Sequence, residues 1–377
     1  MIVSLSSEFD AFKRLDWLPY IPSIENLLIA HLAGWHMFVP SRQVVESLLE
    51  LNQLSERHKL ALSVQISERL AVLHGQAATV SRRILCFPEG SMLDDEDNSL
   101  IQIPLNNFSI IDNCFKSVLL IENPDTDGAF YLHMAKTFGA AGSMKLPLSL
   151  EASHGGGHTT AARVKKLVAE PRPCLILVDG DQTYPGGPEG DTAKQVRIEF
   201  AKSAFKVHQL KITEVKAVEN FVPTCLGVSC LSDRPESLKV AVALERLTQE
   251  EISIGIDMKL SMLAFLNYKK GIKVSSYRKS CQDFRDSVNR FLSYMGITWH
   301  PPADNDTSRD DEQVCFPVNK RFIEIFSDSL RDPEFSTQCE TVFPMSPYFE
   351  HLQEIINEIV AFGIAAQRAP YSLSAVA

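Results

Sequence analysis

The spacing of apolar and polar residues changes twice along the 377-residue chain. In residues 1–112, apolar side chains recur at helical spacing, most clearly over 41–73, where Ser41 is a suitable N-cap. Between residues 113 and 225, short and fully apolar runs alternate with helical stretches, which is typical of strands joined by helices in a parallel sheet. Residues 226–377 return to helical periodicity. The pattern therefore predicts an α/β protein in which a small central domain at 113–225 lies between mainly helical N-terminal and C-terminal regions.

The central region predicts a small parallel sheet with helices on both faces. We expect its strands at 118–121, 146–150, 174–178 and 207–212. We expect helices at 125–138 and 191–204, and between them a helix that follows a glycine turn and ends at residue 169. In the C-terminal region the helical pattern is clearest over 240–247, 283–295, 322–330 and 348–362. A doubly wound unit of this kind binds its ligands beyond the carboxyl ends of its strands.

Composition is that of an ordinary globular protein, with 45% hydrophobic and 22% charged residues. No apolar run approaches the ~20 residues that a membrane-spanning helix needs, and the first residues lack the basic and apolar segments of a secretory signal. We therefore expect a cytoplasmic protein without membrane contact. The eight cysteines include no C-x-x-C pair, which favours buried reduced thiols over disulfides or zinc ligands.

The formal net charge of −10 does not attract nucleic acid to the chain as a whole. Contact with a polyanion then requires a local basic surface, a partner, or metal ions that neutralise carboxylates. A free-standing DNA-binding module is therefore disfavoured, whereas an enzyme with a metal site is not.

Acidic residues stand directly after two of the predicted strands. Glu122 follows the first strand, and the tripeptide Asp179-Gly180-Asp181 follows the third. Carboxylates held this close repel one another unless a cation or a proton lies between them, and hard oxygen ligands suit Mg²⁺ or Mn²⁺. We therefore expect Glu122, Asp179 and Asp181 to form a metal-binding and catalytic site. The alternative is an acidic turn whose carboxylates cap backbone amides.

A strand ending in Glu122, a glycine turn, and a strand ending in Asp179-Gly-Asp181 together resemble the TOPRIM domain of topoisomerases, primases and OLD-type nucleases. The segment Glu219-Asn-Phe-Val-Pro223 resembles an element of the TOPRIM-like nucleases that accompany ABC-type ATPases in bacterial anti-phage defence, such as the PARIS system. The Leu-Ile-Glu-Asn run at the first strand is also similar to the nuclease subunit of Wadjet systems. The resemblance covers about 110 residues and implies Glu122 as a metal ligand or general acid/base, with Asp179 and Asp181 as metal ligands.

Two positions differ from the family pattern. Asn123 stands where the family usually has glycine after the glutamate, and the next acid is Asp127 rather than one residue earlier. Phosphodiester cleavage by an activated water is favoured over a topoisomerase reaction. A topoisomerase needs a tyrosine nucleophile on a large gate domain, and the chain is too short for such a domain. The differences leave open a non-catalytic interaction subunit with a degenerate TOPRIM core.

A second notable run is Ser153-His154-Gly-Gly-Gly-His158-Thr159-Thr160. Glycines before a helix can present backbone N–H groups to a phosphate, so His154, His158 and Thr159 are candidate contacts for a nucleic-acid backbone. No lysine follows the glycines at P-loop spacing, which disfavours an ATPase. The alternative is a tight turn between a strand and a helix.

Basic residues gather in residues 267–279, which contain no acid. Lys269, Lys270 and Lys273 are candidate phosphate contacts, and Tyr268 and Tyr277 are candidates to stack on bases. The alternative is a solvated charged face.

The leading hypothesis is a nuclease that depends on Mg²⁺ or Mn²⁺ and acts as the effector of a defence system with an ABC-type or SMC-type ATPase. The sequence leaves open DNA or RNA as the target, tRNA included, and whether the chain forms a homo-oligomer. A weaker hypothesis is a phosphohydrolase of small nucleotides with Asp179 as nucleophile.

Overall fold

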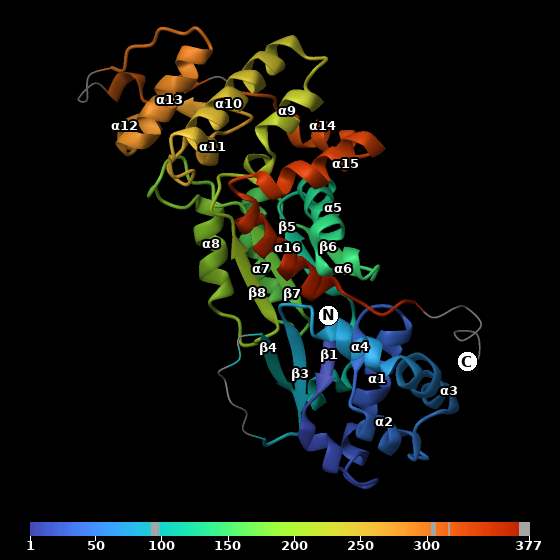
Figure 1. Cartoon of the computed structure of the whole chain (residues 1–377). Helices are drawn as coiled ribbons and strands as arrows, with labels where there is room; N and C mark the ends of the chain where they lie inside the picture. The colour runs from blue at the N-terminus through green and yellow to red at the C-terminus, as the bar shows by residue number, and fades with distance from the viewer. Residues whose placement is uncertain (92–96, 98, 303–306, 316, 369–377) are drawn as a thin grey trace.

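The computed structural model describes residues 1–91, 97, 99–302, 307–315 and 317–368, apart from the side chains of residues 143 and 158. It contains two four-stranded parallel sheets and many helices, so the α/β class with parallel sheets is confirmed. Figure 1 shows the first sheet with its helices at the bottom, the second sheet in the middle, and a helical region at the top.

The N-terminal region holds a sheet that the helical periodicity did not predict. Its strand order is β2-β1-β3-β4, and all neighbouring strands are parallel. Two strands are short, and the other two alternate buried and half-buried positions, so none forms a long apolar run. The strands are β1 (Ile2–Leu5), β2 (Met37–Val39), β3 (Arg83–Phe87) and β4 (Leu100–Pro104).

Helices between these strands occupy the segment where helical spacing was expected. Ser41 caps α2, because its hydroxyl accepts a hydrogen bond from the Val44 N–H. The helices of the region, short 3-10 and π turns included, are η1 (Ser7–Ala11), η2 (Leu18–Tyr20), α1 (Ile21–Leu32), α2 (Arg42–Leu49), α3 (Glu56–Leu60), η3 (Ala61–Ile66), η4 (Ser67–Arg69), α4 (Leu70–Ala77), η5 (Leu105–Ser109) and η6 (Ile111–Cys114).

The second sheet has the order β6-β5-β7-β8, again with parallel neighbours. Its strands are β5 (Ser117–Ile121), β6 (Leu150–His154), β7 (Cys174–Val178) and β8 (His208–Ile212). Three of them lie where the apolar runs predicted strands. The strand expected at 146–150 was wrong in position: β6 begins at Leu150, at the sheet edge, where Glu151, Ala152 and His154 are exposed and no apolar run forms.

Helices cover both faces of this sheet. They are η7 (Pro124–Gly128), α5 (Ala129–Phe138), α6 (Ala140–Ser143), η8 (Gly157–Thr159), α7 (Thr160–Leu167), α8 (Asp191–Phe200) and η9 (Val218–Phe221). Because side chains alternate along a strand, Leu120 and Ile176 pack on the α7–α8 side, whereas Leu119 and Leu175 join the main core on the other side.

The C-terminal region is mainly helical, with one two-stranded antiparallel ribbon. Its elements are α9 (Thr224–Cys230), α10 (Pro235–Ser253), α11 (Met262–Phe265), β9 (Ile272–Lys273), α12 (Val274–Lys279), α13 (Gln282–Tyr294), η10 (Thr307–Arg309), β10 (Gln313–Cys315), α14 (Phe322–Ser329), α15 (Pro333–Val342), η11 (Phe343–Met345) and α16 (Phe349–Gly363). α10, α13, α14 and α16 lie where the four helices were expected, with ends that differ by at most one residue except at α10, which is longer.

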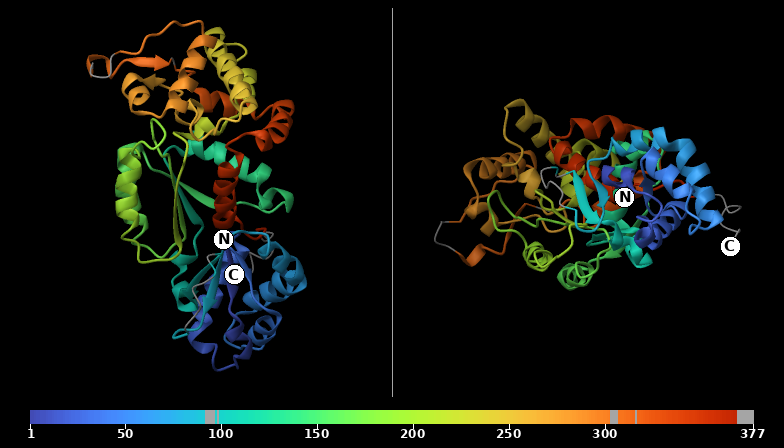
Figure 2. Two further views of the ribbon diagram at one scale, coloured as in Figure 1. Left: turned by 60° about the vertical axis from the view of Figure 1, so that its left-hand side comes forward. Right: turned by 90° about the horizontal axis from the view of Figure 1, so that it is seen from below.

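The last helix, α16, does not stay with the others. It packs against α5 and the second sheet, and its end reaches the N-terminal sheet, where the Met1 amino group donates to the Phe362 carbonyl at 3.2 Å. Figure 2 shows this red helix running from the helical region down beside the second sheet. Within the described residues, no helix is both long and apolar enough to span a membrane.

An acidic cluster as the candidate functional site

The ends of two adjacent strands bring the predicted acids together. β5 and β7 pair in parallel, so Glu122 and Asp179, which follow them directly, lie at the same carboxyl edge of the sheet. Asp181 comes two residues later, in the turn after β7. Electrostatic interactions link the three side chains, because the pKa of Asp179 responds to both of the other carboxylates.

Two further acids complete what we call the acidic cluster: Glu122, Asp127, Asp179, Asp181 and Glu219. Asp127 lies in η7, directly after β5, and Glu219 lies in η9, after β8. The Glu219 side chain is only 3% exposed. Sequence reasoning had noted both residues without assigning them to the site, although each also follows a strand of the same sheet.

Burial and mutual repulsion raise the pKa values of these carboxyls. The pKa of Glu122 rises to about 7 because of burial first and then of the Asp181 and Asp127 charges. The pKa of Asp127 rises to about 6, again through burial first and then through Glu219. The pKa of Asp179 lies well above its usual value, through burial and then the four other acids. Burial and mutual repulsion therefore favour the protonated forms of these carboxyls.

Two lysines partly offset that charge. The Lys269 ammonium lies 3.2 Å from the Glu219 carboxylate, and the Lys216 ammonium lies 3.1 Å from the Asp181 carboxylate. Lys216 is almost buried, with 8% of its side chain exposed, whereas Lys269 is 54% exposed. Neither pairing follows from the sequence, because the partners lie 35 and 50 residues apart along the chain.

The backbone of Asp181 is held in an uncommon conformation. Its φ is 52°, in the left-handed region that a non-glycine residue rarely adopts. The Asp181 N–H donates to the Lys216 carbonyl at 3.2 Å, and the Lys216 ammonium donates back to the Asp181 carbonyl at 3.3 Å. The neighbouring Gly180 has no room for a side chain, since an added Cβ would collide with the Thr213 carbonyl. Contacts with the segment after β8 thus fix the Asp-Gly-Asp turn.

The donor atoms of the cluster suit a hard divalent cation. Glu122 Oε1 is buried and has no hydrogen-bond partner, and the remaining side chains offer carboxylate oxygens, which Mg²⁺ and Mn²⁺ prefer. Nevertheless, nowhere in the described residues do three or more His, Cys, Asp or Glu side chains form a group ready to hold a metal ion. The carboxylates are close enough to raise one another's pKa values, but in the arrangement described they do not form such a group.

Comparisons with models of known families, with curated proteins and with solved structures find no match to this chain. Any function for the chain must therefore be argued from the chemistry of its own residues.

The glycine run forms a tight turn next to Glu122. The Gly155 and Gly156 N–H groups donate to the carbonyls of Ile121 and Glu122, at 2.7 and 3.2 Å. The Thr159 hydroxyl donates to the Gly155 carbonyl at 2.6 Å and so closes the turn. His154 is exposed, while the side chain of His158 lies outside the described residues. The contacts seen here are those of the tight strand-to-helix turn.

The basic residues of the stretch 267–279 have different acidic partners. Lys269 turns toward the acidic cluster, and Lys273 pairs with Asp311 at 2.8 Å, while Lys270 is exposed. The expectation that Tyr268 and Tyr277 stack on bases was wrong for this arrangement. Both rings are buried, the first against Phe322 and the second against Trp299.

Proposed function

We propose that this chain is a metal-dependent nuclease of the TOPRIM type, which cleaves phosphodiester bonds of DNA or RNA. The observation that carries the proposal is the convergence of five carboxylates, from the ends of three parallel strands, at one edge of a doubly wound sheet. Raised pKa values of this size are a mark of functional sites, because a fold gains no stability from burying acids that repel one another.

Each residue has a role in this proposal. Asp179 and Asp181, with Glu122 beside them, would hold the cation, and Mg²⁺ or Mn²⁺ supplies polarisation of the phosphoryl oxygen and neutralises charge on it. Glu122, with a pKa of about 7, can give or take a proton near neutral pH. Lys269 is half-exposed at the rim of the cluster and can meet a backbone phosphate there.

A partner is part of the proposal. The chain is acidic overall, and the basic stretch at 267–279 is partly neutralised by acids of the 310–311 segment. Binding of a polyanion then needs further positive charge, which an ABC-type or SMC-type ATPase or a second copy of the chain would supply. In this proposal the protein acts as the effector of an anti-phage defence system.

Cleavage assays test this function. The full chain is incubated with duplex DNA, single-stranded DNA and tRNA, with Mg²⁺, Mn²⁺ or a chelator. We expect cleavage only with metal, and a loss of about 100-fold or more in Glu122→Gln and Asp179→Asn. Asp191→Asn, which removes an exposed acid at the start of α8, is the matched control and keeps the activity. Unchanged cleavage in both site variants contradicts the proposal.

A second candidate is a non-catalytic interaction subunit with a degenerate core. It is favoured by Asn123 and by the two lysines, which already neutralise Asp181 and Glu219 in place of a cation. The two candidates differ in one simple measurement. A degenerate core shows no rise in melting temperature with divalent cations, whereas a metal site does.

A further inference from the structure

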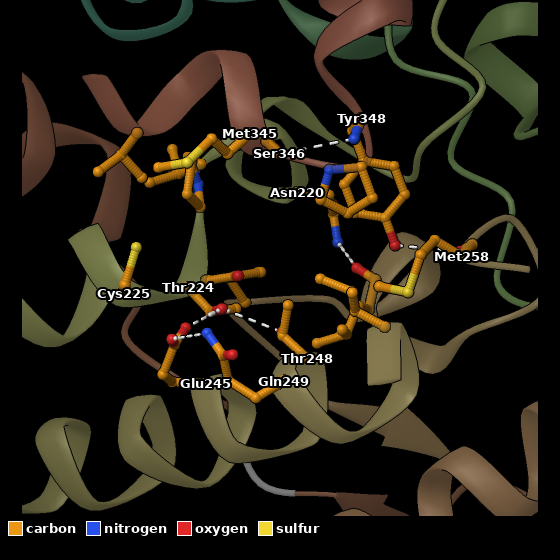
Figure 3. A pocket seen from close by; sticks show the side chains of 17 residues that line it. Asn220, Thr224, Cys225, Glu245, Thr248, Gln249, Met258, Met345, Ser346 and Tyr348 are labelled. Carbon is orange, nitrogen blue, oxygen red and sulfur yellow. Dashed lines mark hydrogen bonds between the residues drawn. The ribbon is translucent and has the colours of Figure 1, made fainter. Parts of the chain in front are cut away.

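Behind the Glu219-Asn220 segment lies a cavity of about 260 Å³ that no part of the proposed nuclease uses. Its walls come from parts of the chain that are far apart in sequence: the segment 220–225, helix α10, the segment 258–268, and residues 342–348 before α16. Figure 3 shows side chains from these segments surrounding an open centre. The volume is just below the ~300 Å³ at which pockets for drug-sized ligands begin, so it suits a small molecule.

Most of the cavity wall is apolar, and its polar residues form two groups. Asn220, Ser346 and Tyr348 lie on one side, and the group on the opposite side, which contains a charged residue, is called the polar end. The apolar lining residues include Val222, Pro223, Ile252, Met258, Leu263 and Met345. In Figure 3 the polar end is formed by Thr224, Glu245, Thr248 and Gln249. Glu245 is the only charged side chain among the described lining residues.

The side chains at the polar end are hydrogen-bonded to one another. Glu245 Oε2 accepts from the Thr224 hydroxyl at 2.6 Å, and Glu245 Oε1 accepts from Gln249 Nε2 at 2.8 Å. The Thr248 hydroxyl donates to the Leu244 carbonyl at 2.9 Å and accepts from the Thr224 hydroxyl at 3.0 Å. With their hydrogens used in this way, the two threonine oxygens and the carboxylate still have lone pairs to offer.

We propose that this cavity binds a primary amine that carries an apolar body. An ammonium group provides three N–H donors and a positive charge, which complement the three acceptors and the single negative charge of the polar end. The apolar body replaces water along the remaining wall. A carboxylate or phosphate in the same place would meet the like charge of Glu245, which disfavours an anion.

The cavity shares two chain segments with the acidic cluster. Asn220 follows Glu219, and Tyr268 precedes Lys269, and both Asn220 and Tyr268 line the cavity. A ligand that fills the cavity therefore contacts the segments that carry the Glu219–Lys269 ion pair. Binding itself does not depend on the metal centre.

Calorimetric titration of the full chain tests the site, with tryptamine as the probe. Indole-3-acetate carries a similar apolar body with the opposite charge, and ammonium chloride carries the charge without the body. We expect both to bind at least about 10-fold more weakly than tryptamine, since a charge-assisted hydrogen bond contributes about a factor of ten or more in affinity. No binding of tryptamine, or equal binding of indole-3-acetate, overturns the proposal.

Variants and a chemical label place the ligand in the cavity. Glu245→Gln should weaken tryptamine binding about 10-fold, while Glu236→Gln, at an exposed position of the same helix, should not. Bound tryptamine should also slow alkylation of Cys225 in the cavity wall but not of the exposed Cys281. An unchanged affinity in Glu245→Gln, or an unchanged alkylation rate at Cys225, overturns the site. Glu122→Gln should bind tryptamine normally, so failure of the metal site is distinguishable from failure of this one.

Discussion

The acidic cluster shows how a few residues set the chemistry of the site. Glu122, Asp179 and Asp181 were predictable from the sequence, because each follows an apolar run that only a buried strand explains. The lysines were not predictable, since a contact between Lys216 and Asp181 depends on how the turns after β7 and β8 meet. Short motifs identify the acids, but only the folded chain shows which cations oppose them.

Replacing Lys216 tests how Asp181 is held. Lys216→Met removes the hydrogen bonds from the ammonium to Asp181, so we expect a loss of about 1 kcal/mol in the free energy of unfolding, modest because Asp181 is 43% exposed. It also leaves the cluster more negative, so Mg²⁺ should raise the melting temperature more than in the wild type. Thermal unfolding with and without Mg²⁺ measures both effects. Lys202→Met, which breaks an exposed pair with Glu199, is the control and should change neither.

The raised carboxyl pKa values predict a pH dependence of metal binding. In the metal-free chain, protonated Glu122 and Asp127 stabilise the fold at low pH, and that stability is lost as pH rises through about 6 to 7. A cation needs the deprotonated forms, so Mg²⁺ must displace protons. From Glu122 alone, we expect an affinity roughly 30-fold lower at pH 5.5 than at pH 8. Equal Mg²⁺ affinity at pH 5.5 and pH 8 would show that Mg²⁺ binding does not require deprotonation of Glu122.

At the scale of elements, the strands of the two sheets differ in how accurately the sequence predicts them. β5 and β7 are buried on both faces and appear as continuous apolar runs, so their positions were predicted within a residue. β2 is three residues long and ends an apolar run that begins in helix α1, while β3 and β4 alternate with half-buried residues. The first sheet was missed because periodicity cannot separate such short strands from the helices around them.

A buried histidine joins α1 to β2 and predicts acid sensitivity of the first sheet. His31 Nδ1 accepts a hydrogen bond from the Phe38 N–H at 3.1 Å, which requires a neutral ring. Burial, and then the charge of Arg69, lower its pKa to about 4. The unfolded chain binds this proton near pH 6.5, so stability from His31 is present above that pH and is lost as pH falls toward 4.

His31→Asn keeps an acceptor at this place and removes the titration. Between pH 7 and pH 5, the wild type should lose roughly 2 kcal/mol more unfolding free energy than the variant. Urea unfolding at the two pH values measures the difference. Equal losses in the two proteins would show that His31 is not the acid-sensitive group.

At the scale of the whole molecule, single contacts join regions that are far apart in sequence. Asn220 Nδ2 donates to the carbonyls of Leu263 and Leu266, at 2.7 and 3.0 Å, and so ties the segment after β8 to the helical region. α16 returns from that region to the second sheet and reaches the first. The sequence predicted α16 as a helix but not its path, because periodicity says nothing about which surface covers an apolar face.

Asn220→Ala tests the tie between the second sheet and the helical region. Two buried carbonyls lose their donor, so we expect a loss of about 2 to 3 kcal/mol in the free energy of unfolding. Asn106→Ala removes a single exposed side-chain bond to Glu89 and should cost much less. Urea unfolding compares the two variants. A similar, small effect in both would show that the regions are held together by apolar packing alone.

The central claim is that the acidic cluster binds a divalent cation, and magnesium titration calorimetry at pH 8 tests it most directly. The wild type and the Asp191→Asn control should release or absorb heat on binding Mg²⁺, whereas Glu122→Gln and Asp179→Asn should lose most of that affinity. Absence of binding in the wild type, or equal binding in the wild type and both cluster variants, would contradict the account.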